Sequence, residues 1–237
     1  MHKKSPTMEP ITKFSDINLT NIKGVLLDLD DTLYCYENCH EVAINHCYQH
    51  YKNNIDKKIS SADFKNFYQQ KRNDVVKKLS FNGSCRSRFF AFQAMFEELD
   101  ITNNFELAKN YNEIYWNIFI NNMNLDNEAL LFLQKCQNLK INICIVTDMT
   151  AIIQIKKLQK LNVAKYIKYL VTSEEVGIEK PNHKIFQTAL NKLNLSSQEV
   201  IMIGDNEEKD IKGAQFLGIK SYKILIKNSN NVEFAKK

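Results

Sequence analysis

The chain has 237 residues, of which 44% are hydrophobic and 25% charged, a balance typical of soluble globular proteins. Its 32 Lys and Arg residues against 27 Asp and Glu give a formal net charge of +5, and the basic residues are spread along the sequence. This distribution argues against nucleic-acid binding and suits a small anionic substrate. No stretch approaches the roughly 20 apolar residues needed to cross a bilayer, so we expect neither nucleic acid nor membrane as a partner.

The N-terminal sequence Met-His-Lys-Lys-Ser-Pro has no apolar stretch behind its charges and so lacks the pattern of a signal peptide. We therefore expect a cytoplasmic protein whose six cysteines are reduced thiols rather than a disulfide framework. Residues 1–20 are polar and irregular, and we expect a frayed lead-in there. The sequence leaves open whether the protein is a monomer or a homodimer.

An apolar run in residues 25–34 ends abruptly in polar side chains. It reads Val-Leu-Leu-Asp-Leu-Asp-Asp-Thr-Leu-Tyr and holds three carboxylates and a hydroxyl. Residues 24–29 are predicted to form a buried parallel strand, whose C-terminal end opens into the crevice where ligands bind in open α/β sheets. Asp28 and Asp30 then share one face, because strand side chains alternate. Such a pair needs a divalent cation or a proton to be tolerated, which indicates phosphoryl chemistry.

A long helical stretch follows this strand. Residues 37 to about 123 show helical periodicity and no convincing strand. The predicted helices cover residues 38–53, 61–79, 84–99 and 102–123. We interpret residues 37–124 as a helical unit inserted in one piece after the first strand.

From Asp126 onward, helices and strands alternate. The predicted helices cover residues 127–138, 151–161, 183–193 and 208–217, and the predicted strands cover residues 141–147, 169–172, 200–203 and 221–226. This alternation indicates a parallel sheet with helices on both faces. The first strand belongs to the same sheet, so residues 21–36 and 125–237 are predicted to form one α/β core.

Polar residues suited to a phosphate site follow the later strands. Thr147 ends the second strand, where a hydroxyl and the backbone N–H groups of a following helix can hold a phosphate. Lys180 precedes a helix, and its ammonium can neutralise both a nucleophile and a transferring group. Asp205 stands at the mouth of the fourth strand and Asp210 lies within the next turn. These strand ends are therefore expected to converge on one site with the carboxylates of the first strand.

In this order and spacing, the residues make the chain similar to the haloacid-dehalogenase-like (HAD) superfamily, and to its branch with an α-helical cap inserted after the first strand. The resemblance extends from about Gly24 to Ile226. It implies a Rossmann-like α/β core with a helical cap, and a Mg²⁺ cofactor. It also implies that Asp28 is the nucleophile that forms an aspartyl-phosphate. Asp30 would be the general acid and base, which protonates the leaving oxygen and later activates water.

The same resemblance assigns the remaining site residues. Thr147 and Lys180 would bind the phosphoryl group together with the backbone N–H of Asp148, whose own carboxylate is expected to point away. Mg²⁺ would be held by Asp205, by the Asp28 carboxylate and by the backbone carbonyl of Asp30. Asp210 would support the metal through water or orient the lysine.

The presence of Asp30 distinguishes among the activities of this superfamily. Similar dehalogenases lack the second Asp because a halide leaving group needs no proton, so the chain is predicted to be a phosphatase acting on a small phosphorylated metabolite. The alternatives are a phosphomutase, in which a sugar hydroxyl accepts the phosphoryl group, and a catalytically silent binding module of the same fold.

Each motif also has a plainer interpretation. The Asp-Asp-Thr segment suits an ordinary turn, Thr147 a strand-end hydroxyl, Lys180 a solvated loop residue and Asp210 a first-turn helix acid. Only their joint occurrence favours a catalytic site.

The predicted helical unit adds two further candidate sites. Arg86 and Arg88 stand near a helix start, where they could bind the non-reacting part of a substrate or lie in solvent. Cys39, His46 and His50 could share one helix face and hold zinc, but their spacing matches no finger or ribbon motif, and core or surface roles are the alternative.

Overall fold

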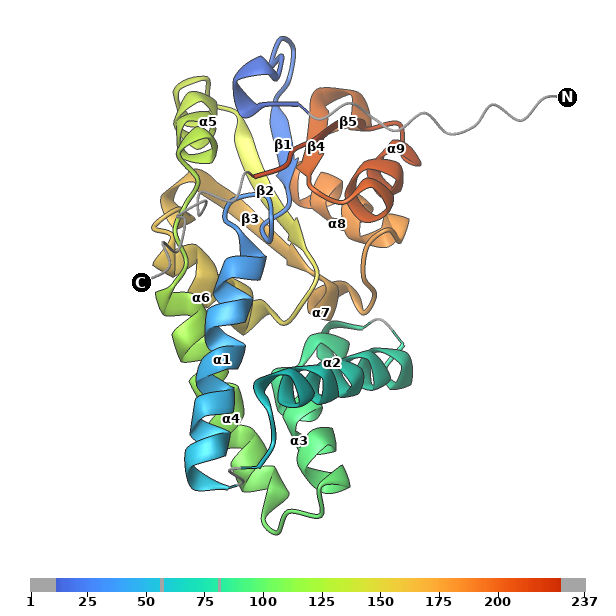
Figure 1. Ribbon diagram of the computed structural model, residues 1–237. Coiled ribbons are helices and arrows are strands. Elements are labelled where there is room, and N and C mark those ends of the chain that lie inside the picture. The colour runs from blue at the N-terminus through green and yellow to red at the C-terminus, as the bar shows by residue number, and fades with distance from the viewer. Residues whose placement is uncertain (1–11, 56–57, 81, 227–237) are drawn as a thin grey trace, which may run out of the picture.

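The computed structural model describes residues 12–55, 58–80 and 82–226. Within them, a five-stranded sheet has the order β3-β2-β1-β4-β5, and each printed strand pairing is parallel. The strands are β1 (Gly24–Leu27), β2 (Asn142–Thr147), β3 (Ile167–Thr172), β4 (Val200–Gly204) and β5 (Lys220–Lys223). Strand β1 lies in the centre, with Gly24 opposite Asn142 on one side and Val200 on the other. The predicted parallel α/β core is therefore confirmed (Figure 1).

Helices cover both faces of the sheet because side chains of β1 alternate between two apolar clusters. Val25 and Leu27 pack in the cluster that includes residues of α5 (Asn127–Asn138) and α6 (Ala151–Lys160). Leu26 packs in the cluster of α8 (His183–Leu193) and α9 (Gly213–Gln215). All four residues of β1 are buried, as expected for a central parallel strand.

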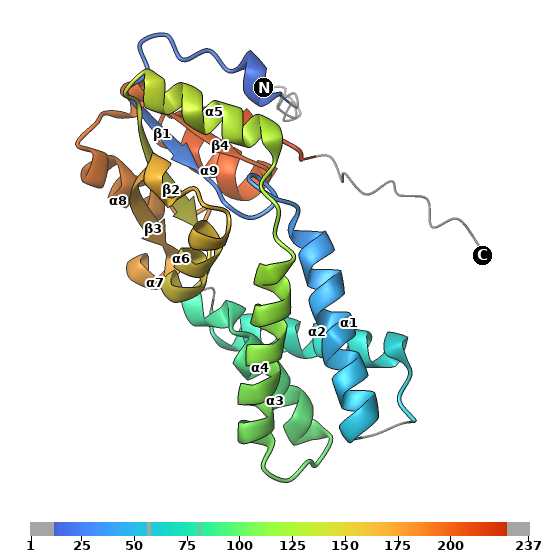
Figure 2. The ribbon, with the colours of Figure 1, turned by 90° about the vertical axis from the view of Figure 1, so that its left-hand side faces the viewer.

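A helical insertion, residues 36–121, lies beyond the C-terminal ends of the strands (Figures 1 and 2). It consists of α1 (Tyr36–Asn54), α2 (Ser61–Lys78), the 3₁₀ turn Gly83–Arg86, α3 (Arg88–Glu98) and α4 (Asn104–Asn121). Its centre is aromatic: Tyr68 and Phe92 have ring centroids 4.6 Å apart, and Phe96 and Tyr111 5.0 Å apart. Phe92 and Phe96 of α3 are buried in this centre, whereas Phe90 of the same helix is 40% exposed.

The two linkers that join the insertion to the sheet run side by side. The first linker, residues 28–35, leaves β1, and the second, residues 122–126, returns to α5. The backbone N–H of Asp126 donates to the carbonyl of Leu33 at 2.9 Å. The Asp126 side chain also accepts from the N–H of Ala129 at 2.9 Å and so caps α5. Both connections are thereby fixed at one place.

The predicted helices at residues 127–138 and 183–193 are confirmed to the residue. The predicted helix 84–99 is wrong as a single element, because the extended backbone of Ser87 divides it into a 3₁₀ turn and α3. The predicted helix 208–217 begins instead as a π-helical turn, Glu207–Lys212, and continues as the short α9. Short elements that the sequence analysis did not predict are the 3₁₀ turns Phe14–Asp16, Ala164–Tyr166 and Ser197–Glu199 and the helix α7 (Ser173–Val176).

The expectation of a frayed lead-in over residues 1–20 is wrong for its described part, and residues 1–11 lie outside the described residues. Phe14 and Ile17 are buried, and the Phe14 ring lies 5.1 Å from that of Phe132 on α5. The backbone N–H of Thr12 also donates to Lys223 on β5. A search of the described helices finds none long and apolar enough to span a membrane.

Candidate active site

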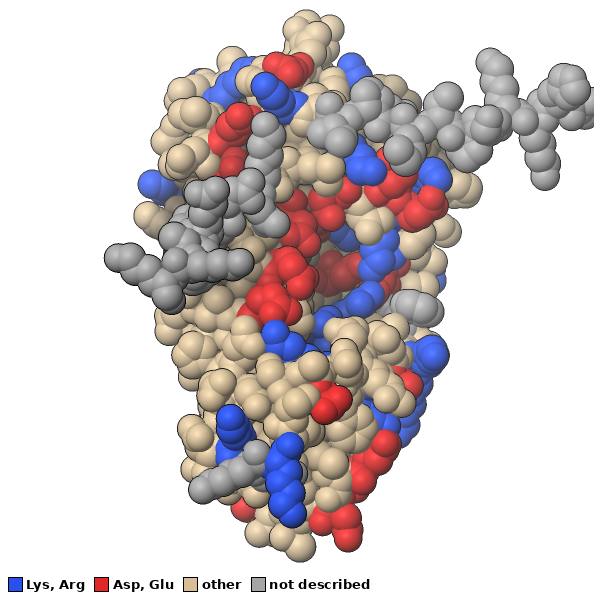
Figure 3. Space-filling model, in the orientation of Figure 1, with Lys and Arg blue, Asp and Glu red and all other residues tan. Residues whose placement is uncertain are grey.

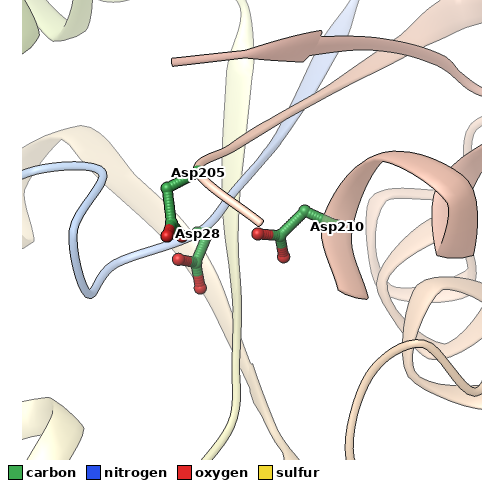
Figure 4. A group of neighbouring side chains, drawn as sticks. All are labelled: Asp28, Asp205 and Asp210. Carbon is green, nitrogen blue, oxygen red and sulfur yellow. The ribbon is translucent and has the colours of Figure 1, made fainter. Parts of the chain in front are cut away.

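Three carboxylates meet at the C-terminal edge of the sheet (Figure 4). Asp28 directly follows β1 and Asp205 directly follows β4, two strands that are neighbours in the sheet. Asp210 reaches the same point from the π-helical turn behind β4. Each offers an oxygen within 4.8 Å of those of the others. The sequence-predicted convergence of strand ends is thus present in the structure.

Lys180 lies inside this group of carboxylates. Its ammonium donates to Asp28 at 2.6 Å, to Asp210 at 2.6 Å and to the backbone carbonyl of Val146 at 3.1 Å. Burial alone lowers the pKa of Lys180, but the charges of Asp210 and Asp28 outweigh it and hold that pKa well above its ordinary value. The lysine therefore stays cationic beside the nucleophile candidate.

The carboxylates themselves carry more negative charge than their surroundings balance. Burial, together with Asp210 and Asp205, raises the pKa of Asp28 well above its usual range, although Lys180 opposes the shift. Burial, Asp210 and Asp31 raise the pKa of Asp205 to about 6. Both shifts arise first from burial and then from the neighbouring carboxylates, which disfavour the ionised forms.

The backbone around the group is fitted closely to it. A Cβ added to Gly204 would lie 2.5 Å from the Asp210 carboxyl, so only glycine leaves room for that side chain. The second Asp210 oxygen accepts from the N–H of Asn206 at 3.0 Å. Asp31 has a positive φ of 58° and accepts from the N–H of Tyr36 at 2.8 Å, which satisfies the first turn of α1. Asp31 is thus tied to the start of the insertion.

Asp30 lines the same cavity but stands outside the group of three carboxylates. Its oxygens accept from the buried ammonium of Lys157 at 2.7 and 3.0 Å, from Gln154 at 3.4 Å and from the Tyr34 hydroxyl. Burial raises the pKa of Asp30, but Lys157 and these hydrogen bonds outweigh it and lower the pKa overall. The carboxylate is held in position by α6 and by its own linker.

Thr147 and Asp148 also line the cavity. The Thr147 hydroxyl accepts from Gln154 at 2.6 Å. Asp148 directs one carboxylate oxygen to the backbone N–H of Lys180 at 2.9 Å and the other to the Lys209 ammonium at 2.6 Å. Both oxygens of Asp148 therefore have partners within the protein.

The helical insertion closes the cavity from the opposite side. The cavity has a volume of about 360 Å³, and the insertion contributes Tyr36, Arg72, Arg86 and Arg88 to its lining. Figure 3 shows acidic side chains gathered in the hollow between the sheet and the insertion, with basic side chains beside them. Arg86 is engaged in an ion pair with Glu179, whereas Arg88 is buried. The two candidate arginines thus have different surroundings.

The sequence analysis missed Gln154, Lys157 and Glu179. On helix α6 the structure exposes Ile152 and Ile155 and buries the polar Gln154 and Lys157 together with Leu158, an arrangement that the sequence alone does not reveal.

The zinc alternative gains no support from the structure. Cys39 lies against backbone carbonyls, His50 bonds to the Tyr111 hydroxyl, and His46 is exposed. Among the described residues, the three aspartates form the group of side chains that could hold a metal ion, and no such group of cysteines and histidines is found.

Comparison with known proteins agrees with this architecture. The model of the haloacid dehalogenase-like hydrolase family matches residues 25–224. The chain therefore belongs to the haloacid dehalogenase-like hydrolases. A solved structure with the same fold is the 2-haloacid dehalogenase of Pseudomonas syringae, with a TM-score of 0.69 and 19% identity over 84% of this chain and 85% of that one.

Curated relatives that cover most of the chain are phosphatases by name. A ribulose-1,5-bisphosphate 5-phosphatase of Halopiger xanaduensis is 29% identical over 84% of this chain and 82% of its own. A glyceraldehyde 3-phosphate phosphatase of Methanocaldococcus jannaschii is 26% identical over 86% of this chain and 85% of its own.

Proposed function

We propose that this hydrolase is a Mg²⁺-dependent phosphatase that acts on a small phosphomonoester through an aspartyl-phosphate on Asp28. The observation that carries the proposal is the contact of Asp28 with Lys180 inside the group of three carboxylates, all of which line the cavity. The named relatives support the same activity, because both remove a phosphate from a small phosphorylated molecule.

The donor set fits Mg²⁺. The three carboxylates supply hard oxygen ligands, which Mg²⁺ prefers. In their ionised forms they carry three negative charges against the one positive charge of Lys180, so a divalent cation would neutralise the remainder. Asp28 and Asp205 would hold the ion with the backbone carbonyl of Asp30, and Asp210 would support it while it orients the lysine. Bound there, the ion would shield the charge of the substrate phosphate and help to position it.

Hydrolysis proceeds in two displacements. An Asp28 oxygen attacks phosphorus and the bond from phosphorus to the ester oxygen breaks. The negative charge of the bound phosphate would raise the pKa of Asp30, so that its carboxyl takes up a proton and supplies it to the leaving alcohol. Asp30 then takes a proton from water, which attacks the aspartyl-phosphate and releases inorganic phosphate and free Asp28. Lys180, the Thr147 hydroxyl and the Asp148 backbone N–H hold the phosphoryl oxygens. Most of the rate enhancement comes from this positioning and charge neutralisation.

Lys157 and Gln154 act as positioning residues in this scheme. Neither side chain lines the cavity, yet Lys157 holds the carboxylate of Asp30, and Gln154 holds both Asp30 and Thr147. Their contacts fix the acid/base group and the phosphate-binding hydroxyl relative to each other. Asp30 must turn part of its carboxyl toward the ester oxygen when substrate is bound.

Release of phosphate from p-nitrophenyl phosphate, with Mg²⁺ and with excess chelator, tests the proposal. We expect turnover that needs the ion and that Asp28→Asn abolishes, with the far-ultraviolet circular dichroism of the variant unchanged. Full activity of Asp28→Asn would disprove the assignment of the nucleophile. Isomer formation without phosphate release from a sugar phosphate would identify a mutase, and inactivity across a broad ester panel a binding module.

A further inference from the structure

Most charged side chains that line the cavity are balanced by an opposite charge within the protein. Lys180 contacts two aspartates, Lys209 contacts Asp148 and Glu179, and Arg86 pairs with Glu179. The lining cations that have no carboxylate partner among the described residues are Arg72 and Arg88. Both belong to the helical insertion and face the catalytic carboxylates across the cavity.

Arg88 is buried without a counter-ion. Arg88 is only 3% exposed. Its guanidinium donates to the Tyr36 hydroxyl and, at 3.1 Å, to the backbone carbonyl of Arg86. The Nε–H has no hydrogen-bond partner. A buried charge without a partner is strongly destabilising in a folded protein. An anion supplied from outside the protein would remove this penalty.

Two aromatic rings lie close to the guanidinium of Arg88. The guanidinium carbon lies 5.1 Å from the centroid of the Tyr115 ring and 5.3 Å from that of Trp116. Aromatic rings at this range attract an arginine cation and help to hold it in place. The Nε–H, which has no partner, is therefore the donor left for a ligand.

A second cavity adjoins the catalytic cavity at Tyr36 and Arg72. Tyr68 has a buried hydroxyl that makes no hydrogen bond. With Tyr36 and Arg72 it lines this second cavity, which has a volume of about 310 Å³. Burial raises the pKa of the Tyr36 hydroxyl, yet Arg88 and Arg72 outweigh it and lower that pKa. The positive charge of the two arginines thus dominates this wall.

We propose that Arg88 and Arg72, with the hydroxyl of Tyr36, bind a second anionic group of the substrate at the end remote from the reacting phosphate. This inference rests on the proposed phosphatase activity and adds the substrate class: a small phosphomonoester that also carries a carboxylate or a second phosphate. Arg86 takes no part, because Glu179 already occupies its guanidinium.

Matched substrate pairs that differ only in the remote group test the proposal. One pair is 3-phosphoglycerate and glycerol 3-phosphate, which compares a carboxylate with a hydroxymethyl group. The other is the bisphosphate and the monophosphate of propane-1,3-diol. We expect kcat/KM to favour the anionic member of at least one pair by tenfold or more, since a charged hydrogen bond contributes about 10- to 100-fold. The pair that shows the preference identifies the anion.

Arg88→Met and Arg72→Met should each reduce this preference at least about fivefold, and Arg88→Lys should restore part of it. Lys77→Met, on the exposed side of the helix that carries Arg72, is the matched control and should keep the wild-type preference. Circular dichroism and the midpoint of urea unfolding verify that each variant is folded. If Arg88→Met misfolds, Arg72→Met still tests the proposal, because Arg72 is partly exposed.

Two outcomes separate this inference from the proposed function. Turnover of p-nitrophenyl phosphate with no preference in either pair, or a preference that both methionine variants retain, would overturn the second-anion site and leave the phosphatase intact. Failure to turn over p-nitrophenyl phosphate and every member of both pairs would instead overturn the phosphatase itself.

Discussion

Arg86 of the helical insertion and Glu179 of the loop before α8 form a bidentate ion pair, with Nε to Oε1 and Nη2 to Oε2 both at 2.6 Å. The Glu179 side chain is only 1% exposed and also accepts from Lys209 at 3.1 Å. Glu179 directly precedes Lys180, whose ammonium contacts Asp28. The position of the insertion is thereby coupled to the backbone that carries Lys180.

Breaking this pair should weaken the closed arrangement. A double-mutant cycle with Arg86→Met and Glu179→Gln should give a coupling free energy of about 1 to 3 kcal/mol in urea unfolding, because the pair is largely desolvated. The exposed pair of Lys109 and Glu113 on α4 is the control, with an expected coupling of about 0.5 kcal/mol or less. Equal coupling in the two cycles would show that Arg86 and Glu179 form no more than a surface pair.

Gly83 allows the contact between the insertion and the α/β core to be tested without a change of charge. A Cβ at this position would lie 2.6 Å from the backbone of Glu174 in α7, so the insertion and the sheet must separate to admit it. Gly83→Ala should raise KM for p-nitrophenyl phosphate by about tenfold, the order of effect that a small displacement of a closing element produces. Ser84→Ala at the next position should leave KM unchanged. A wild-type KM in Gly83→Ala would mean that contact at Gly83 has no part in closing the cavity.

Mg²⁺ should stabilise the folded protein. At a concentration about 100-fold above the dissociation constant, binding adds about 2.7 kcal/mol, or roughly 5 to 10 °C in Tm for a chain of this size. Asp205→Asn should remove most of the increase, because it takes away one of the three converging carboxylates. Glu208→Gln, which changes an exposed carboxylate that pairs with Lys212, should keep it. Differential scanning calorimetry with and without the ion gives the comparison, and a Tm indifferent to Mg²⁺ would contradict the metal site.

His40 should make the stability of the protein depend on pH. Burial, with Arg88 and Arg72, lowers the pKa of His40 to about 3, from an ordinary value of 6.5. Between these values the unfolded chain binds a proton that the folded protein excludes, so the free energy of unfolding falls as the pH is lowered. From about pH 7 to about pH 5, His40 alone should account for a loss of about 2 kcal/mol.

Urea unfolding of wild type and His40→Gln at the two pH values measures this contribution. The glutamine side chain keeps a polar atom near the Tyr115 hydroxyl, which the His40 ring contacts at 2.8 Å. The variant should lose less stability than wild type on acidification, by the amount stated above. His46→Gln, at an exposed position, is the control. If wild type and His40→Gln lost the same unfolding free energy on acidification, His40 would have the same pKa in the folded and the unfolded protein.

The parts of the site that could be predicted from sequence are those fixed by strand ends. Asp28, Lys180 and Asp205 follow or precede regular elements, and parallel strands bring such positions to one edge whatever the loops do. The alternation of helix and strand likewise fixed the fold class, because a parallel sheet needs a crossover between successive strands.

The remaining parts depend on contacts between distant segments, which local patterns do not encode. Lys157 reaches Asp30 from a position 127 residues away, and Arg86 reaches Glu179 over 93 residues. The division of the predicted helix at Ser87 reflects a capped helix start, since the Ser87 hydroxyl accepts from the N–H of Phe90. The position of Arg72 at the cavity could not be predicted from the sequence. Arginine is common on a largely polar helix, and only its neighbours in space distinguish this one.

The hydrogen bond from Asp126 to Leu33 has a consequence for how such a protein can diversify. Because it brings the two linkers together, the strand pairings that position Asp28 and Asp205 do not require any particular length or shape of the segment between them. A helical unit of different origin could be spliced in at this junction, and the enzyme would exchange one set of recognised molecules for another while its reaction chemistry stayed the same.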